Sequence, residues 1–217
     1  MTKPILKWSD YRQILGRITP LNKDWLTPVE YLPYIDALLG DIDLDPCSTH
    51  HANAQFLRAK QIYTLDDDGL NKQEPWKGKT YLFPPTYGRC SFHAKRQTWR
   101  WSMRAGGVSK APSIIWFRRL LREWKLRNVP EALFYSIYPE MLRICPEIWE
   151  FPICIPTDRA NLIHGEKLFR LQAPMYWGFF IYLPPASLIE NSTARFQEIF
   201  SQIGRAHVWT PVTFRNL

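Results

Sequence analysis

Apolar side chains recur at helical spacing directly after Pro28. The positions are Val29, Tyr31, Leu32, Ile35, Leu38 and Leu39. Proline suits the first turn of a helix and glycine often follows the last, so the pattern predicts an amphipathic helix from Pro28 to Gly40. Asp41–Leu44 alternates acidic with apolar residues and is stopped by Pro46, which predicts a short strand. The Asp45-Pro46-Cys47 sequence then lies at the carboxyl end of that strand.

Further apolar runs predict the rest of a sheet. Thr80–Phe83 predicts a strand that ends at Pro84, because proline cannot donate to a sheet. Ile114–Leu126 predicts a helix with a basic face. Three more strands are predicted at Ala132–Ile137, Ile148–Ile155 and Tyr176–Leu183. Strands that alternate with helices indicate an α/β fold with an open, mostly parallel sheet, helices on both faces, and ligands bound outside the carboxyl ends of the strands.

The length and composition fit one globular domain. The chain has 217 residues, of which 46% are hydrophobic, so it is long enough to bury a sizeable core. No run of about twenty apolar residues occurs, and residues 1–16 lack the apolar stretch of a secretory signal. We therefore expect a cytoplasmic protein that does not associate with membranes.

The cysteines and histidines do not form a recognisable metal site. Cys47, Cys90, Cys145 and Cys154 lack the paired spacing of a structural zinc site. We expect reduced thiols, buried as small apolar side chains. His50 and His51 follow Cys47, but no further ligand cluster completes a site, so we expect a polar loop there and no bound metal.

The basic residues concentrate in one part of the chain. Arg89–Arg127 has a net charge of +10, against +8 for the whole chain. Basic side chains that neutralise phosphates release condensed counterions, so this segment predicts a polyanion partner, with DNA as the natural candidate. The candidate DNA-binding residues are Arg89, Lys95, Arg96, Arg100, Arg104 and Lys110. Aromatic residues of the segment would stack on exposed bases; they are Phe92, Trp99, Trp101, Trp116, Phe117 and Trp124. The alternative is a solvated basic face with these aromatic side chains turned into the core.

Four short motifs follow one another along the first part of the chain. They are Trp25-Leu-Thr-Pro28, Leu44-Asp-Pro-Cys47, Asp68-Gly-Leu70 with Trp76-Lys-Gly78, and Phe83-Pro-Pro-Thr-Tyr-Gly88. In this order and spacing they resemble the phage-type DNA N6-adenine methyltransferase family. The resemblance covers about residues 24–88 and extends more loosely to Leu183. It implies a Rossmann-like methyltransferase fold, S-adenosylmethionine as cofactor, and DNA as substrate, with no obligate protein partner evident.

The resemblance places the cofactor pocket at the first three motifs. The residues it implies are Trp25, Thr27, Pro28, Asp45, Pro46, Cys47 and Asp68. A carboxylate at a strand end can accept hydrogen bonds from an adenosine or ammonium group in a crevice that also buries the thioether. Two of these residues have an ordinary structural alternative: Asp45 as a helix or turn cap, and Asp68 as a turn residue in an acidic run.

The family's catalytic motif begins with Asn or Asp, continues with two prolines and ends with an aromatic residue. An adenine amino group is a poor nucleophile because its lone pair is delocalised into the ring. Acceptors from the side chain and the adjacent backbone carbonyl hold the amine, while the aromatic ring stacks on the flipped base. The corresponding residues here are Phe83, Pro84, Pro85 and Tyr87.

This chain departs from the catalytic motif at its first position. Phe83 has no side-chain acceptor, and Thr86 stands before the aromatic Tyr87. If the missing hydrogen bond counts as much as an oxyanion-hole donor, its loss lowers the rate about 10²- to 10³-fold. The Pro84 carbonyl remains as an acceptor. A purely structural alternative is that the two prolines only end a strand.

Three functions are compatible with these features. The first is transfer of a methyl group from S-adenosylmethionine to the adenine amino group in DNA. The second is a catalytically impaired module with a methyltransferase fold that binds DNA or cofactor without turnover. The third is methylation of RNA or protein, because the chemistry of the motif is not tied to one polymer. A shared fold does not decide among them.

The last residues of the chain have a different character. Residues 203–213 read Ile-Gly-Arg-Ala-His-Val-Trp-Thr-Pro-Val-Thr, which resembles the conceptual translation of a common high-throughput sequencing adapter with its stop codon read as Trp209. The segment has no helical or strand periodicity. We therefore expect one domain over residues 1–202, with a basic insert at about 89–127, and a non-native tail over 203–217. The alternative is an ordinary polar C-terminal tail.

Overall fold

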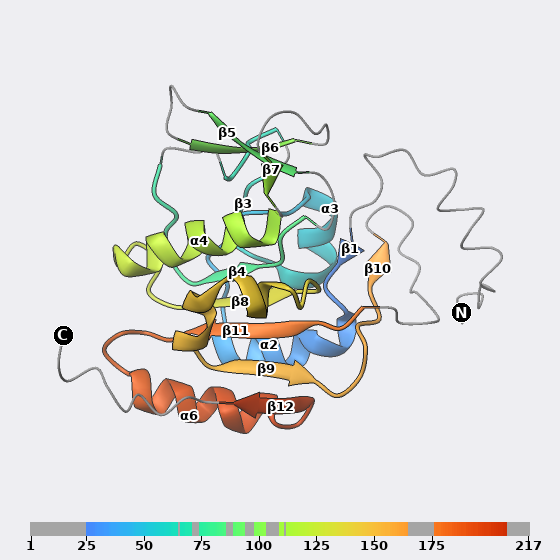
Figure 1. Ribbon diagram of the computed structural model, residues 1–217. Coiled ribbons are helices and arrows are strands. Elements are labelled where there is room, and N and C mark those ends of the chain that lie inside the picture. The colour runs from blue at the N-terminus through green and yellow to red at the C-terminus, as the bar shows by residue number, and fades with distance from the viewer. Residues whose placement is uncertain are drawn as a thin grey trace, which may run out of the picture.

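A seven-stranded sheet forms the centre of the molecule (Figure 1). The computed structural model describes residues 25–64, 66–70, 74–85, 89–93, 98–102, 109–110, 112–164 and 176–207. Across the sheet the strand order is β12-β9-β11-β8-β4-β2-β3. In chain order these strands are β2 (Leu44–Asp45), β3 (Gln61–Ile62), β4 (Thr80–Leu82), β8 (Ala132–Ser136), β9 (Ile153–Pro156), β11 (Phe179–Leu183) and β12 (Gly204–His207).

Five of the seven strands run in the same direction. β3, β2, β4 and β8 pair in parallel, and β11 is antiparallel to both β8 and β9, so β9 has the direction of β8. β12 is antiparallel to β9. The first parallel strand, β2, lies between the second, β3, and the third, β4, so the path across the sheet reverses between β2 and β4. In open parallel sheets a crevice forms at such a reversal, outside the carboxyl ends of the strands.

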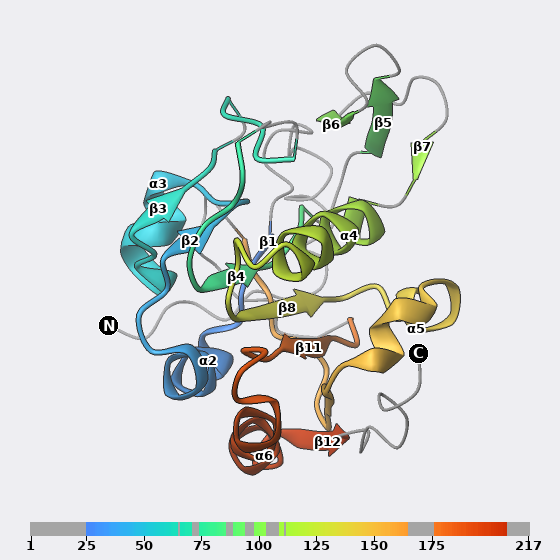
Figure 2. The ribbon, with the colours of Figure 1, turned by 90° about the vertical axis from the view of Figure 1, so that its left-hand side faces the viewer.

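Helices cover both faces of this sheet, as predicted for an α/β fold (Figure 2). α4 (Pro112–Lys125), α5 (Met141–Ile144) and the 3-10 helix η4 (Pro146–Glu150) pack on one face. α2 (Leu32–Leu39) and α6 (Ile189–Phe200) pack on the other. Three short elements complete the set: the 3-10 helix η2 (Val29–Tyr31), α3 (His50–Ala52) and the π-helix η3 (Asn53–Leu57).

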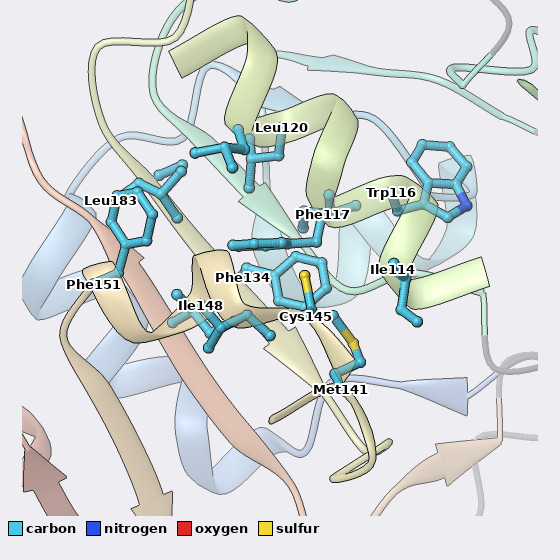
Figure 3. Close-up of a cluster of buried hydrophobic side chains, with 14 of the residues drawn as sticks. Ile114, Trp116, Phe117, Leu120, Phe134, Met141, Cys145, Ile148, Phe151 and Leu183 are labelled. Carbon is cyan, nitrogen blue, oxygen red and sulfur yellow. The ribbon is translucent and has the colours of Figure 1, made fainter. Parts of the chain in front are cut away.

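The two faces of the sheet bury two separate hydrophobic clusters. Alternation along β8 sends Phe134 toward α4 and Tyr135 toward α2 and α6. Figure 3 shows the first cluster, in which Phe117 of α4 meets Phe134 edge to face with ring centroids 5.2 Å apart. On the other face Tyr135, Phe180 and Phe200 form a continuous aromatic layer. These layers explain why β4, β8 and β11 are buried at every position.

Most predicted elements are present, with shifted ends. The helix after Pro28 is split into η2 and α2, because Pro33 belongs in a first helical turn and the α-helix therefore begins only at Leu32. It ends before Gly40 as predicted; Gly40 has φ +62°. Ile114–Leu126 and Ala132–Ile137 correspond closely to α4 and β8.

Two predicted strands are wrong in part. Of Asp41–Leu44 only Leu44 is in β2, and the Asp43 side chain before it accepts from the backbone N–H of Lys79 at 2.9 Å and from Lys60 Nζ at 2.9 Å. Of Ile148–Ile155, the first part belongs to η4 and only the last three residues to β9. Pro146 explains the difference, since proline favours the start of a helical turn.

Two smaller sheets lie outside the central one. β1 (Trp25–Leu26) pairs antiparallel with β10 (Ile163–His164). β5 (Arg89–His93), β6 (Thr98–Ser102) and β7 (Ser109–Lys110) form a three-stranded antiparallel sheet that lies next to the start of α4, away from the central sheet (Figures 1 and 2). This small sheet occupies the predicted basic insert. Within the described ranges, no helix has the length and apolar character needed to cross a membrane.

Gly204–His207 form a strand, although the end of the sequence shows no strand periodicity. These residues form β12, an edge strand paired with β9. A Cβ at Gly204 would lie 2.2 Å from the carbonyl oxygen of Ile155, so this pairing requires glycine there. Residues 208–217 lie outside the described residues, and the proposed non-native origin of the tail stays a prediction.

Candidate functional site

A narrow pocket opens at the carboxyl ends of β2 and β4, where the path across the sheet reverses. Its enclosed volume is about 30 Å³, and the free space reaches about 400 Å³ only when the open solvent at its mouth is counted. The residues that line it are Trp25, Leu26, Thr27, Asp45, Cys47, Ser48, Thr49, Ala52, Phe56, Leu57 and Phe83. Five of the predicted site residues, Trp25, Thr27, Asp45, Cys47 and Phe83, therefore come together here from three segments that are far apart in the sequence.

Asp45 is a buried carboxylate in the pocket wall. It is the last residue of β2, and its side chain is 3% exposed. Its Oδ1 accepts a hydrogen bond from the backbone N–H of Cys47 at 3.1 Å, and its backbone carbonyl accepts from Tyr63 at 3.0 Å. The turn-cap role considered for Asp45 is thus present. The same residue also lines the pocket, so the two roles are combined in one side chain.

Thr27 forms the wall opposite the β2 turn. Its hydroxyl lies 2.8 Å from the phenol oxygen of Tyr81, and both side chains are buried. Burial raises the pKa of Tyr81 well above its usual value, so the phenol stays protonated and available for this hydrogen bond. Trp25 and Leu26 are held by pairing with β10, which fixes this wall against the rest of the fold. Pro28 is buried beside the pocket but is not among its lining residues.

Asp68 lies close to the pocket without lining it. A Cβ at Gly69 would be only 2.3 Å from the Pro46 carbonyl oxygen, so the two turns touch and the contact requires glycine. Trp76 Nε1 donates to the Gly69 carbonyl at 3.1 Å and anchors the segment from behind. Asp68 itself has φ +47°, the left-handed conformation that the turn interpretation predicts. The second and third motifs are therefore neighbours, although Asp68 and Pro46 are not in the lining.

Phe83 occupies the pocket position at which the family motif carries an acceptor. Its ring is 8% exposed and meets the ring of Tyr135 edge to face, with centroids 4.9 Å apart and an interplanar angle of 61°. The side chain is part of the aromatic layer on the α2 face. Pro84 and Pro85 follow it and are buried. Tyr87 lies outside the described residues.

Sequence reasoning missed the helical part of the pocket. Ser48, Thr49, Ala52, Phe56 and Leu57 line it from the segment that joins β2 to β3. Thr49 caps α3 by accepting from the backbone N–H of Ala52 at 3.0 Å, and a threonine before a helical segment is a recognisable signal. The polar loop predicted at His50 and His51 is wrong, because both residues belong to α3.

The basic segment Arg89–Arg127 is not one surface. Arg118 pairs with Glu147 (Nε to Oε1, 3.1 Å). Arg119 pairs with Glu123 (Nε to Oε1, 3.0 Å) and lies over the ring of Trp76. The chain enters α4 after the carboxyl end of β4 and leaves it before the amino end of β8. There the backbone carbonyl of Asn128 accepts a hydrogen bond from the backbone N–H of Gly78, which precedes β4, at 3.2 Å. Lys125, at the end of α4, therefore lies near the amino ends of the parallel strands, whereas the pocket is at their carboxyl ends.

The aromatic residues of α4 are in the core, so the prediction that they stack on bases is wrong for this helix. Trp116 and Phe117 are buried against the sheet because they fall on the apolar face of α4. Trp124 is partly buried, packs edge to face on Phe151 and donates from Nε1 to the Pro184 carbonyl at 2.9 Å.

The small sheet separates two of the candidate DNA-binding positions from a third. Arg89 pairs with Ser102 and Arg100 with Ser91, which puts Arg89 and Arg100 at positions of the same face. Lys110 pairs with Cys90, at a position of the opposite face. By the same register, Phe92, Trp99 and Trp101 are at positions of the face that carries Lys110. Lys95, Arg96 and Arg104 lie outside the described residues.

No protein-family model, curated protein or solved structure matches this chain. A functional assignment therefore depends on the four motifs and on the pocket that three of their segments form.

Proposed function

We propose that this protein is an S-adenosylmethionine-dependent DNA methyltransferase that acts on the N6 amino group of adenine, and that its fold is Rossmann-like. One observation carries the proposal: Trp25-Leu-Thr-Pro28, Leu44-Asp-Pro-Cys47 and the strand end at Phe83 converge on one pocket at the reversal between β2 and β4. The first four parallel strands run in the order 2-1-3-4, with the antiparallel β11 between the fourth and the fifth, and in doubly wound sheets ligands bind at such a reversal.

The donor set of the pocket suits this cofactor. S-adenosylmethionine combines cationic groups, among them the sulfonium that carries the methyl group, with ribose hydroxyls and a flat adenine ring. Asp45 supplies a buried carboxylate for a cationic or hydroxyl group. Trp25, Phe56 and Phe83 supply apolar walls around it, and Thr27 supplies a hydroxyl. When bound, the cofactor supplies the methyl group that is transferred.

The role of this chain in the transfer step is to hold the target amine. The Pro84 carbonyl, next to Phe83, supports this role as the acceptor that the motif retains. In the proposed mechanism it accepts a hydrogen bond from the adenine amino group, which localises the nitrogen lone pair toward the methyl group. With one acceptor in place of two, we expect a transfer rate about 10²- to 10³-fold below that of an enzyme with both.

A second candidate function is a binding module that retains the pocket but not the chemistry. The packing of Phe83 against Tyr135 favours it, because the side chain at the acceptor position serves the core. Both candidates require cofactor or DNA binding. They differ only in whether a methyl group is transferred.

Cofactor binding is tested by calorimetry with S-adenosylmethionine on the wild-type protein, on Asp45→Asn and on Asp36→Asn. Asp45→Asn keeps the Oδ1 acceptor for Cys47 but removes the charge, so we expect folded protein with at least tenfold weaker binding. Asp36 is exposed on α2 and is the matched control. If folded wild-type protein does not bind at millimolar cofactor, both candidate functions lose their cofactor.

Methyl transfer is tested with labelled S-adenosylmethionine and mixed-sequence DNA, followed by mass spectrometry of the nucleosides. Label in N6-methyladenine supports the enzyme. Cofactor binding without label in any base supports the binding module. Label in RNA or protein supplied as alternative substrates, with none in DNA, would contradict the proposed substrate.

A further inference from the structure

An exposed tryptophan lies beneath an arginine on the surface of the molecule. The guanidinium carbon of Arg159 is 5.5 Å from the ring centroid of Trp177. Trp177 is 45% exposed, and Arg159 is exposed as well. At an exposed site such a pair stabilises a fold only modestly. One exposed aromatic ring is ordinary on a protein surface, but here a guanidinium is held over it, so a stacking surface and a cation lie together.

The pair is held by the ends of two adjacent strands. Arg159 follows the carboxyl end of β9, and Trp177 precedes β11. Because β11 runs opposite to β9, its start lies at the same edge of the sheet as the end of β9. The backbone N–H of Ala160 donates to the Tyr176 carbonyl at 2.7 Å and ties the two segments together. The position of the pair is therefore set by the fold.

Two routes connect this pair to the pocket. Through the sheet, a Cβ at Gly178 would lie 2.3 Å from the Tyr135 hydroxyl, so the residue after Trp177 touches Tyr135, whose ring in turn packs on Phe83. Along the chain, the segment after Arg159 leads to β10, where Ile163 pairs with Leu26 in the pocket wall. Arg159 and Trp177 thus lie on the same side of the sheet as the pocket, at the carboxyl ends of the parallel strands.

We propose that Trp177 and Arg159 form a DNA contact next to the pocket, with Trp177 stacking on a nucleobase and Arg159 binding a neighbouring phosphate. The inference rests on the proposed function for its choice of DNA. Outside Arg89–Arg127 the net charge of the chain is −2, which is +8 for the whole chain less +10 for that segment. Asp158 is exposed beside Arg159, so binding here depends on stacking and one guanidinium instead of a broad basic field. Nucleobases suit such a site because each has a face that stacks on an aromatic ring.

The test compares Trp177→Ala and Arg159→Ala with Trp149→Ala, a matched control. Trp149 is 43% exposed but lies on η4, and its Nε1 donates to the Leu142 carbonyl at 2.8 Å. Affinity for a labelled mixed-sequence duplex, and for one of its single strands, is measured by anisotropy from about 50 to 200 mM salt. The cofactor is not needed for this measurement.

For Trp177→Ala we expect about 5- to 150-fold weaker binding with an unchanged salt dependence, because a stacked base is lost. For Arg159→Ala we expect the slope of log affinity against log salt on the duplex to fall by about 0.9, because one phosphate contact is lost. Trp149→Ala should behave as the wild type.

Several outcomes would overturn this inference. Unchanged affinity of Trp177→Ala, with or without a lower melting temperature, makes the pair a structural contact only. Loss of a dimer in Trp177→Ala, at constant DNA affinity, makes the surface an interface between copies of the chain.

If wild-type protein binds DNA but transfers no methyl group, the enzyme proposal fails while the contact stands. If wild-type protein binds no DNA, both fail.

Discussion

At the scale of single residues, the three cysteines whose side chains the structure describes differ in accessibility. Cys145 and Cys154 are buried, and burial raises the pKa of each thiol to about 12. For Cys145 the neighbouring Glu147 carboxylate, 3.2 Å from the thiol, adds to this increase. Cys47 is partly exposed and lines the pocket. Since the thiolate is the reactive form, the three should react very differently.

We expect alkylation of the folded protein at pH 8 to modify Cys47 and to leave Cys145 and Cys154 unmodified. Saturating S-adenosylmethionine should protect Cys47, because the proposed cofactor covers it. Peptide mapping by mass spectrometry measures each site separately, and Cys90 is followed in its own peptide. Equal modification of Cys47 with and without cofactor, in protein shown to bind it, would place the cofactor elsewhere.

Phe83 connects packing with the proposed chemistry. Phe83→Asn restores the amide acceptor of the family motif but removes a ring that packs on Tyr135. We expect the free energy of unfolding to fall by about 3 kcal/mol, as for other large-to-small core substitutions. We also expect the single-turnover rate of adenine methylation to rise by up to about 10²-fold.

Phe83→Leu is the matched control for that substitution, because it changes the packing without adding an acceptor. Urea denaturation and single-turnover assays, performed at a temperature where both variants are folded, separate the two effects. A rate for Phe83→Asn at or below that of Phe83→Leu would mean that an acceptor at this position does not limit the reaction.

At the scale of elements, the basic segment divides into two parts with different positions. Arg122 and Lys125 lie on the exposed face of α4, which leads away from the pocket edge. Arg89 and Arg100 lie in the small sheet, which follows directly after the strand end at Phe83. If DNA enters at the pocket, the second pair is the nearer along the chain, because Arg89 comes six residues after Phe83.

We therefore expect Arg89→Ala with Arg100→Ala to reduce the slope of log affinity against log salt by up to about 1.8, two phosphate contacts at about 0.9 each. Arg122→Ala with Lys125→Ala should change it little. A salt titration of duplex binding measures both variants. The reverse result would mean that DNA binds along α4 and away from the pocket.

Elements with strong periodicity were predictable, and those defined by pairing were not. α4 has an apolar stripe over fourteen residues, and β8 is apolar from Ala132 to Tyr135, so both are evident in the sequence. β2 and β3 are two residues each, which is too short for a periodic pattern to predict where either strand begins and ends. In the small sheet, Cys90 and Phe92 do alternate with polar residues, but the high charge around them favoured an interpretation as a basic insert.

At the scale of the whole molecule, the site depends on which strands are neighbours. Motifs at strand ends were visible in the sequence, and so was their order. That β2 lies between β3 and β4 was not visible, because no local pattern encodes the pairing of short parallel strands. This arrangement brings Asp45 and Phe83 to one pocket. The antiparallel pairing of β11 with β8 and β9 brings Trp177 to the same side of the sheet from almost a hundred residues further along the chain.

Buried ionisable groups are distributed through the whole core, and they predict how stability depends on pH. Burial raises the pKa of Tyr81, Tyr135 and Tyr182 above the usual value, and raises that of Cys145 and Cys154 to about 12. In the unfolded chain these thiols ionise near pH 8.5 and these phenols near pH 10. Above these pH values the buried thiols and phenols are still protonated in the folded protein but ionised in the unfolded chain.

The contribution of these groups to the free energy of unfolding should therefore be complete below about pH 8.5 and should fall as the pH rises above it. Each group lowers the free energy of unfolding by about 1.4 kcal/mol per pH unit once the unfolded form has ionised. From pH 9 to pH 11 the two thiols alone predict a loss of about 5 kcal/mol, a large part of the stability of a typical domain. Urea denaturation at pH 8, 9, 10 and 11 measures this loss, and Cys154→Ala should lessen its slope above pH 9 by about 1.4 kcal/mol per unit, whatever its effect at pH 8. A free energy of unfolding that stays constant to pH 11 would contradict this prediction, because it would mean that these side chains ionise as readily in the folded protein as in the unfolded chain.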